Sequence, residues 1–301
     1  MLLFVSVLTF FFVNLSPGGP SSIMRIDATA EQREALTVRL GLDKPVPERY
    51  ASWLGAAVRG DLGNSLLTDE PVSKRIADRL PATLLLAGVS LTASIVLGIP
   101  LGVVSALRRN RLVDHAVGLF SVLGLSVPAF WLGIVMILLF SVELRLLPSS
   151  GIVTVGEDSL ADRLAHLAMP SVVLATTILP SVVRFTRSSL LEVLGQDYVR
   201  TAVAKGLAPL VVTYVHALRN ALIPVVSVIG TLLPRLLGGA VVTEAVFGWP
   251  GMGRLALEAA NGRDYPLVMG ITMVVALVAI VTSLVVDLAY TWLDPRLRLA
   301  A

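Results

Sequence analysis

Two clusters of basic and small side chains in the stretch 188–220 are the strongest candidates for a functional site. The first runs from Arg200 to Gly206 and predicts a short helix, ended by a glycine that lets the backbone turn sharply. The second runs from His216 to Asn220. Apolar side chains recur at spacings of three and four, at Leu191, Leu194, Tyr198 and Ala202. One face of this segment is therefore expected to dock on a partner, which is mechanical rather than covalent work. The alternative is that its cations bind anionic lipid headgroups.

Covalent and metal chemistry find little support in the residue types. The sequence has no cysteine, which excludes thiolate nucleophiles, disulfides and iron–sulfur ligation. The histidines at 115, 166 and 216 are scattered without metal-ligand spacing. No Gly-x4-Gly-Lys-Ser/Thr motif occurs, so the phosphate cradle of a P-loop ATPase is missing. We therefore predict that the chain is not an enzyme and binds neither a metal nor a cofactor.

Membrane helices must position these clusters. The 301 residues are 55% hydrophobic and only 15% charged, with a mean hydropathy of +0.82. Soluble domains carry about 25% charged residues. Spanning the hydrocarbon takes about 20 apolar residues, and five segments qualify: 82–107, 116–142, 167–183, 221–242 and 266–292. A sixth segment, 1–15, is short, and we interpret it as a first transmembrane helix whose start is missing. The sequence predicts an all-α polytopic membrane protein with about six spans.

Charged loops set the predicted orientation and domain limits. Arg108, Arg109 and Arg111 make one short loop basic, and the stretch 188–220 is also basic, so both are expected in the cytoplasm. The acidic segments 143–163 and 244–264 are expected outside, which leaves both termini in the cytoplasm. The hydrophilic region 16–80 is then a small external helical subdomain. A membrane domain at 81–292 and a tail at 293–301 follow.

Few polar or helix-breaking residues fall within the predicted spans. Arg235 could line a translocation cavity and attract a substrate carboxylate, or it could snorkel to the surface or pair with Glu244. Ser126 and Pro128 mark an interruption of the span 116–142, and Pro180 marks one in 167–183; each proline permits either a gating bend or a static kink. No Asp or Glu lies centrally in a span, which argues against an ion-coupled secondary transporter. No histidine lies at membrane depth beside a serine, which argues against an intramembrane protease.

Further motifs follow one another in an order that is similar to a known family. They are Leu40-Gly41-Leu42-Asp43-Lys44-Pro45, Arg59-Gly60-Asp61-Leu62-Gly63-Asn64-Ser65, Arg79-Leu80-Pro81-Ala82-Thr83-Leu84, the two clusters described above, Glu244-Ala245-Val246-Phe247 with Trp249-Pro250-Gly251-Met252-Gly253, and Leu293-Asp294-Pro295-Arg296. Over nearly its whole length the chain resembles the first permease subunit of the dipeptide/oligopeptide/nickel ABC importers. It departs from that pattern in its missing first residues and at Arg235, where an apolar or small residue is expected.

The resemblance implies a type I ABC importer transmembrane fold in a bacterial or archaeal plasma membrane. It also implies partners: a second, homologous permease subunit, two ATPase subunits that use ATP and Mg²⁺, and an external substrate-binding protein. The function implied is binding-protein-dependent import of di- or oligopeptides by alternating access. Nickel chelates, glutathione and sugars are the alternative substrates within the family, and an ion-coupled secondary transporter is the alternative from another class.

The resemblance also assigns candidate site residues. Those of the ATPase-coupling loop are Tyr198, Arg200, Thr201, Ala202, Ala204, Lys205, Gly206, His216, Arg219 and Asn220. Those of the translocation cavity are Arg235, Ser126 and Pro128. Those of the last external loop are Glu244, Phe247, Pro250, Gly251 and Gly253.

Overall fold

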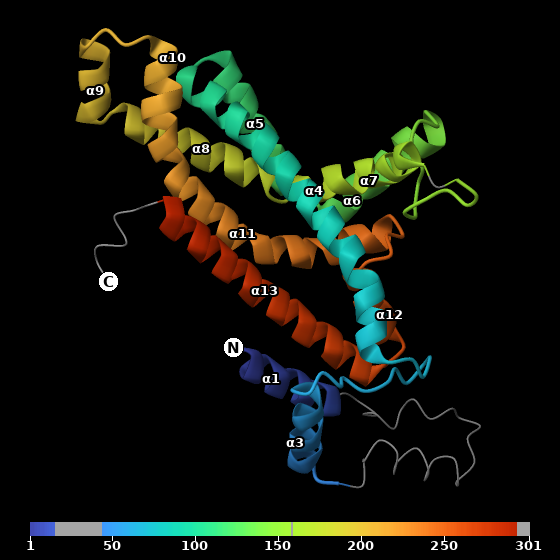
Figure 1. Cartoon of the computed structure of the whole chain (residues 1–301). Coiled ribbons are helices and arrows are strands. Elements are labelled where there is room, and N and C mark those ends of the chain that lie inside the picture. The colour runs from blue at the N-terminus through green and yellow to red at the C-terminus, as the bar shows by residue number, and fades with distance from the viewer. Residues whose placement is uncertain (16–43, 158, 294–301) are drawn as a thin grey trace. The chain divides into compact units, whose positions relative to one another are not determined.

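The computed structural model in Figure 1 describes residues 1–15, 44–157 and 159–293. The side chains of 234, 235, 237, 239, 287 and 289–293 are also outside the described set. Most of the predicted tail 293–301 and the first part of the region 16–80 therefore lie outside the described residues. Within the described ranges all regular structure is helical, apart from one isolated bridge between Asn64 and Pro71.

The helices follow the apolar segments of the sequence. In chain order they are α1 (Leu2–Leu15), α3 (Val46–Ala57), α4 (Val72–Leu107), α5 (Leu112–Ser126), α6 (Ala129–Met136), the π-helix η2 (Ile137–Glu143), α7 (Leu160–Ala175), α8 (Leu179–Leu194), α9 (Asp197–Ala204), α10 (Pro209–Val211), the π-helix η3 (Val212–Ala217), α11 (Leu218–Val246), α12 (Met252–Asn261) and α13 (Tyr265–Leu293).

Two predicted spans are bent pairs rather than straight helices. The pair α5 and α6–η2 turns by 101°, and the pair α7 and α8 turns by 52°. Proline has no N–H and disfavours the helical region at the preceding residue, and Val127, just before Pro128, has an extended ψ of 122°. The prediction that Pro128 and Pro180 interrupt their spans is thus confirmed. Among the described residues, three helices are long and apolar enough to cross a membrane, or up to five spans if each bent pair counts as one; α1 is a shorter apolar helix.

The chain divides into two compact units. The first unit contains Met1–Ala82 and Pro250–Val278, and the second contains Thr83–Trp249 and Ala279–Ala301. The core of the first unit joins the start of α4 to α12 and the start of α13 through Val72, Ile76, Met252, Leu255, Ala259, Leu267 and Ile271. This packing explains why α4 begins at Val72, ten residues before the predicted span: its first turns are amphipathic and bury Val72 and Ile76.

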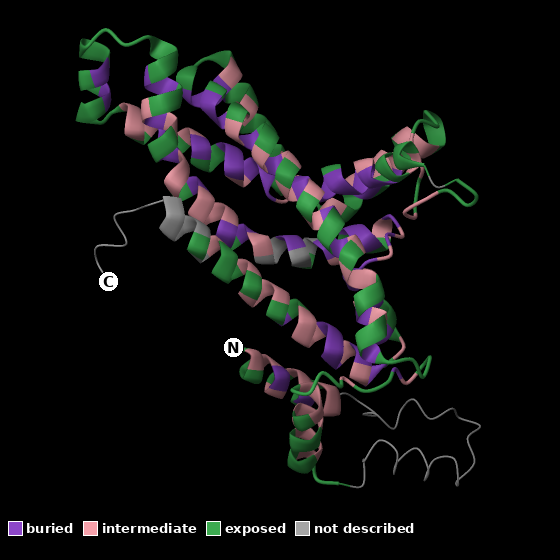
Figure 2. Ribbon diagram, viewed as in Figure 1, coloured by how far each residue is buried: buried purple, intermediate pink, exposed green. Residues whose placement is uncertain are grey.

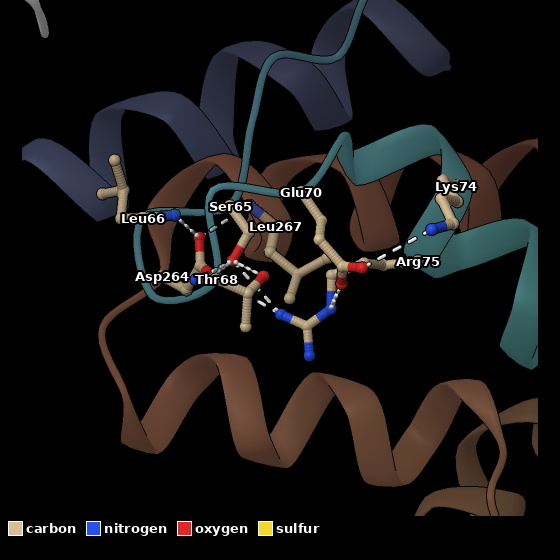
Figure 3. Close-up of polar contacts among 8 residues, drawn as sticks. All are labelled: Ser65, Leu66, Thr68, Glu70, Lys74, Arg75, Asp264 and Leu267. Carbon is tan, nitrogen blue, oxygen red and sulfur yellow. Dashed lines mark hydrogen bonds and ion pairs between the residues drawn. The ribbon is translucent and has the colours of Figure 1, made fainter.

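Asp264 fastens a loop of the first unit to the start of α13 (Figure 3). Its carboxylate is fully buried and accepts a hydrogen bond from Ser65 Oγ. The backbone N–H of Leu66 donates to Oδ1 at 3.1 Å, and that of Leu267 donates to the same oxygen at 3.4 Å. Arg75 Nη1 lies 3.8 Å from Oδ2 and supplies the opposite charge. The loop before α4 is therefore tied to α13 by a charged, buried group.

We expect Asp264→Asn to loosen this loop. Arg75 would lose its buried anion and one donor would lose its acceptor, at a cost of about 1–3 kcal/mol. Limited proteolysis of the purified protein should cleave the segment 59–71 faster than in the unchanged chain. Glu258→Gln is the matched control, because Glu258 pairs with Arg254 on the exposed side of α12. Equal cleavage rates in both variants would contradict the fastening role.

Candidate functional site

The segment 188–220 forms two helices separated by a break, not one continuous helix. α8 ends at Leu194, Gly195 and Gln196 form a turn, and α9 begins at Asp197. α9 ends at Ala204, and Gly206 has a φ of +77°, a left-handed conformation that glycine adopts without strain. The expected stripe Leu191–Leu194–Tyr198–Ala202 is therefore divided between α8 and α9, because the turn at 195–196 changes the helix direction.

α9 is held against its own chain by two buried residues. Val199 and Ala202 are only 3% and 8% exposed, and both belong to a core cluster with residues of α4, α8, η3 and α11. Val103 and Ala217 are members of this cluster from distant parts of the sequence. Ala202, which was expected to permit close approach of a partner, instead permits close approach of α9 to the rest of the chain.

The remaining surface of α9 and of the turn after it is exposed. Figure 2 shows a buried stripe on α9 beside a wider exposed surface. Val203 is 60% exposed, Leu207 40% and Leu210 71%, and Ala204 is exposed between them. We call these four residues the α9 apolar patch. Because α9 lies in a basic loop rather than in an apolar span, an apolar patch there is more typical of a protein contact than of lipid contact.

Basic residues surround this patch with little internal pairing. Arg200 Nη1 lies 3.4 Å from Asp197 Oδ1, but both side chains are largely exposed, and such a pair contributes about 0–1 kcal/mol. Lys205 and Arg219 are exposed as well. The combination of exposed apolar and basic groups is suited to a groove with apolar walls and an acidic rim.

A hydrogen bond joins the two clusters that the sequence singled out. Asn220 Nδ2 donates to Tyr198 Oη at 2.8 Å and, at 3.4 Å, to the carbonyl oxygen of His216. This bond connects α9 directly to α11, the helix that follows the loop. Thr201 Oγ1 donates to its own helix, to the Asp197 carbonyl at 2.9 Å, and so stabilises α9 locally. A side-chain contact thus links α9 to a long apolar helix.

An ion pair that the sequence analysis missed connects α4, α5 and α8. Arg187 Nε and Nη2 donate to Asp114 Oδ1 and Oδ2 at 2.6 and 2.7 Å, a two-pronged arrangement. Ser105 Oγ donates to Asp114 Oδ1 at 2.5 Å, and the N–H of Asn110 donates to Oδ2 at 2.9 Å. Asp114 is only 6% exposed. The sequence did contain a signal for this pair: Asp114 lies just inside an apolar helix and follows three arginines.

A second missed feature is a cavity of about 480 Å³ on α8. Its lining residues are Ser181, Arg184, Phe185, Arg187 and Ser188. Four of these lie at spacings of three and four, so they share one face of the helix, while the buried residues of α8 include Val182, Val183, Thr186 and Leu190. Arg184 is exposed, and no ion pair of Arg184 occurs among the described residues. A signal was present in the sequence, because the polar residues of this apolar segment recur with a helical period.

The described residues do not test the prediction that Ser126, Pro128 and Arg235 line a translocation cavity. Ser126 ends α5 and donates to the Val122 carbonyl at 2.9 Å, and Pro128 caps α6 at the sharp bend. Arg235 lies in α11, but its side chain is outside the described residues. Their assignment to a cavity stays a prediction.

The residues predicted for an external loop are mostly buried. Glu244 is 0% exposed and accepts a hydrogen bond from Thr83 Oγ1 at 2.5 Å. Phe247 is 2% exposed and packs with Met169 and Val173. In the first unit, Gly251 precedes α12, and both Gly251 and Gly253 are buried, whereas Pro250 is partly exposed. Among the described residues, no three His, Cys, Asp or Glu side chains cluster in a way that could hold a metal ion.

Comparisons with known proteins cover the whole chain. Residues 98–299 match the family described as the inner membrane component of binding-protein-dependent transport systems, and residues 1–87 match the N-terminal region of such components. The dipeptide transport system permease protein DppB of Escherichia coli (strain K12) is 42% identical over 319 residues, covering 98% of this chain and 94% of the relative. The oligopeptide transport system permease protein AppB of Bacillus subtilis (strain 168) is 40% identical over 302 residues, covering 99% and 95%.

A solved structure has a similar fold. The inward-facing methionine ABC transporter MetNI matches with a TM-score of 0.59 and 20% identity, over 73% of this chain and 96% of that one.

Proposed function

The chain belongs to the family of inner-membrane components of binding-protein-dependent transport systems, and on this premise we propose that it is a permease subunit that imports dipeptides or oligopeptides. The family predicted from the sequence is confirmed, and so is the all-α polytopic membrane fold of type I ABC importers. The observation that carries the peptide assignment is identity of 40% and more to two peptide permeases along nearly the full length of both chains.

We propose that the chain works with partners that supply energy and substrate. Two ATPase subunits would bind and hydrolyse ATP with Mg²⁺, a second permease subunit would complete the pathway, and an external binding protein would deliver the peptide. The basic loops around Arg108 and α9 would face the cytoplasm, with both termini on the same side. The exposed α9 apolar patch supports α9 as the part that an ATPase subunit grips.

Vesicles that contain the complete transporter would test this function. With ATP on the side of α9 and the binding protein on the other, a labelled tripeptide should accumulate, and it should not do so when the ATPase subunits are omitted. Competition by nickel chelates, glutathione or sugars would measure the alternative substrates. Uptake driven by a proton or sodium gradient without ATP would reject the importer in favour of a secondary transporter.

The α8 cavity is a candidate part of the peptide pathway. Arg184 lies one residue past the predicted span 167–183, and an arginine so close to the lipid is expected to face water or a partner. Arg184 offers an unpaired guanidinium between the hydroxyls of Ser181 and Ser188, and Phe185 adds an apolar wall. We infer that Arg184 attracts the carboxylate of a peptide in transit.

We therefore expect Arg184→Gln to slow uptake of peptides with a free carboxyl terminus by on the order of tenfold, because a charged hydrogen bond contributes about 1.5–3 kcal/mol. Uptake of the same peptide with an amidated terminus should change little. Arg263→Gln is the control, since Arg263 lies in the short loop between α12 and α13. If the variant slows both peptides equally, Arg184 has no role in carboxylate recognition.

A further inference from the structure

A small, partly open cavity in the first unit is lined by residues of α1, α3, the loop before α4 and the start of α13. Its volume is about 150 Å³. The lining residues are Phe10, Val13, Asn14, Arg49, Trp53, Leu66, Tyr265, Pro266 and Met269. None of these lining residues belongs to the candidate sites described above.

Two hydrogen-bonding groups of this cavity have no partner. Trp53 Nε1 and Tyr265 Oη are both buried and make no hydrogen bond within the described part of the protein. Tyr265 as a whole is only 9% exposed. Leaving such a group unsatisfied costs about 1–3 kcal/mol, so native proteins rarely do so without a bound molecule.

The hydroxyl group of the neighbouring Tyr50 has a hydrogen-bond partner, unlike Trp53 Nε1 and Tyr265 Oη. Tyr50 Oη lies 2.8 Å from Ser6 Oγ, a hydrogen bond between α3 and α1. Its ring packs edge-on against Phe10, with 5.4 Å between the ring centroids. The Trp53 ring also packs near Phe10, with 6.3 Å between the ring centroids, but its indole N–H has no acceptor among the described residues.

Arg49 supplies a positive charge to the same cavity. Its guanidinium lies 5.8 Å from the centroid of the Phe10 ring, and it forms no ion pair with any described carboxylate. Partial burial lowers the pKa of Arg49 from its ordinary value, which indicates a cation that has lost water without gaining an anion. A cation and two orphan donors around one cavity are suited to an oxyanion.

We propose that this cavity binds the phosphate group of a phospholipid. The walls of the cavity are mostly apolar, and the nearby surface of α1 exposes Phe11, Phe12 and Leu15, on which acyl chains can lie. A free phosphate ion offers the same oxygens but has no acyl chains that could cover this apolar surface. The lipid joins α1 to α3 and α13 at the polar end of α1, where aromatic and basic side chains are typical of the membrane interface.

The simpler interpretation is that Trp53, Tyr265 and Arg49 touch interfacial lipid without selecting it. The two interpretations differ in stoichiometry: a built site retains one phospholipid through purification, whereas general interfacial contact retains none. The proposal does not depend on the proposed transport function, because retention of a lipid is measured without ATP or peptide.

Native mass spectrometry of the intact, detergent-purified transporter tests the proposal. One phospholipid per copy of this chain should remain bound, and its occupancy should fall about tenfold or more in Arg49→Gln. Tyr265→Phe, which removes one oxygen and leaves the cavity shape intact, should weaken retention too. Arg49→Lys should restore part of it. Arg59→Gln is the matched control, since Arg59 is exposed just after α3.

Three outcomes would overturn the proposal. One is a chain that carries no phospholipid, and another is equal retention in all variants. The third separates the two sources of phosphate: labelled inorganic phosphate that binds to the chain in an Arg49-dependent way, while no lipid is retained, would assign the cavity to a free anion.

Discussion

Val203→Glu is expected to reduce ATP-driven peptide uptake by about 30-fold or more while the permease still folds and inserts. Val203 is the most exposed large apolar side chain of α9 and belongs to the α9 apolar patch. If this patch sits in a groove of an ATPase subunit, a carboxylate there would be desolvated without a partner. Loss of a central contact in a protein interface typically costs 2 kcal/mol or more, which corresponds to that factor. Uptake, ATP hydrolysis and co-purification of the ATPase subunits should be measured together.

Two further variants give the prediction its controls. Leu112→Glu places the same charge on an even more exposed apolar residue, at the start of α5, and should leave uptake unchanged. Ala202→Glu would place it on the buried side of α9, within the core cluster, and should lower the thermal stability of the chain itself. If Val203→Glu transports normally with the ATPase subunits bound, α9 does not dock through this face.

The sequence predicted the position of α9 better than its orientation. The small residues from Arg200 to Gly206 indicated a helix and its end, because both are decided by neighbours within a few residues. The buried side of α9 is decided by Val103 and Ala217, which come from other helices. Periodicity alone therefore placed Tyr198 and Ala202 on one docking face, whereas Tyr198 is bonded to Asn220 and Ala202 is buried.

The bends in the spans and the buried polar groups likewise have features that the local sequence predicts and features that depend on distant residues. Pro128 and Pro180 indicated where two spans are interrupted, since proline acts on the adjoining backbone. The angles of 101° and 52° depend on tertiary packing and could not be predicted. Glu244 was assigned to an external loop from the acidic segment 244–264 and from the family resemblance. Its partner Thr83 lies 161 residues away in the chain, beyond any local pattern.

The ion pair between Asp114 and Arg187 is expected to be the largest single polar contribution to the stability of the second unit. Asp114→Ala would leave Arg187 facing a buried site without its anion, and would leave Ser105 Oγ and the Asn110 N–H without an acceptor. Breaking a buried pair from one side costs about 3–5 kcal/mol. Because the Arg187 side chain is 33% exposed, we expect a loss of about 3 kcal/mol, at the low end of that range.

Thermal unfolding of the purified chain in detergent would measure this loss, and a double variant would identify its cause. Asp114→Leu combined with Arg187→Met replaces both charges by apolar groups of similar size, so no uncompensated charge remains. The double variant should therefore be more stable than Asp114→Ala, whereas Arg108→Gln, in the loop between α4 and α5, should match the unchanged chain. A double variant as unstable as the single one would mean that Asp114 acts through the Asn110 turn rather than through Arg187. The ion pair between Asp114 and Arg187 would then result from the packing of α4, α5 and α8 and would not stabilise that packing.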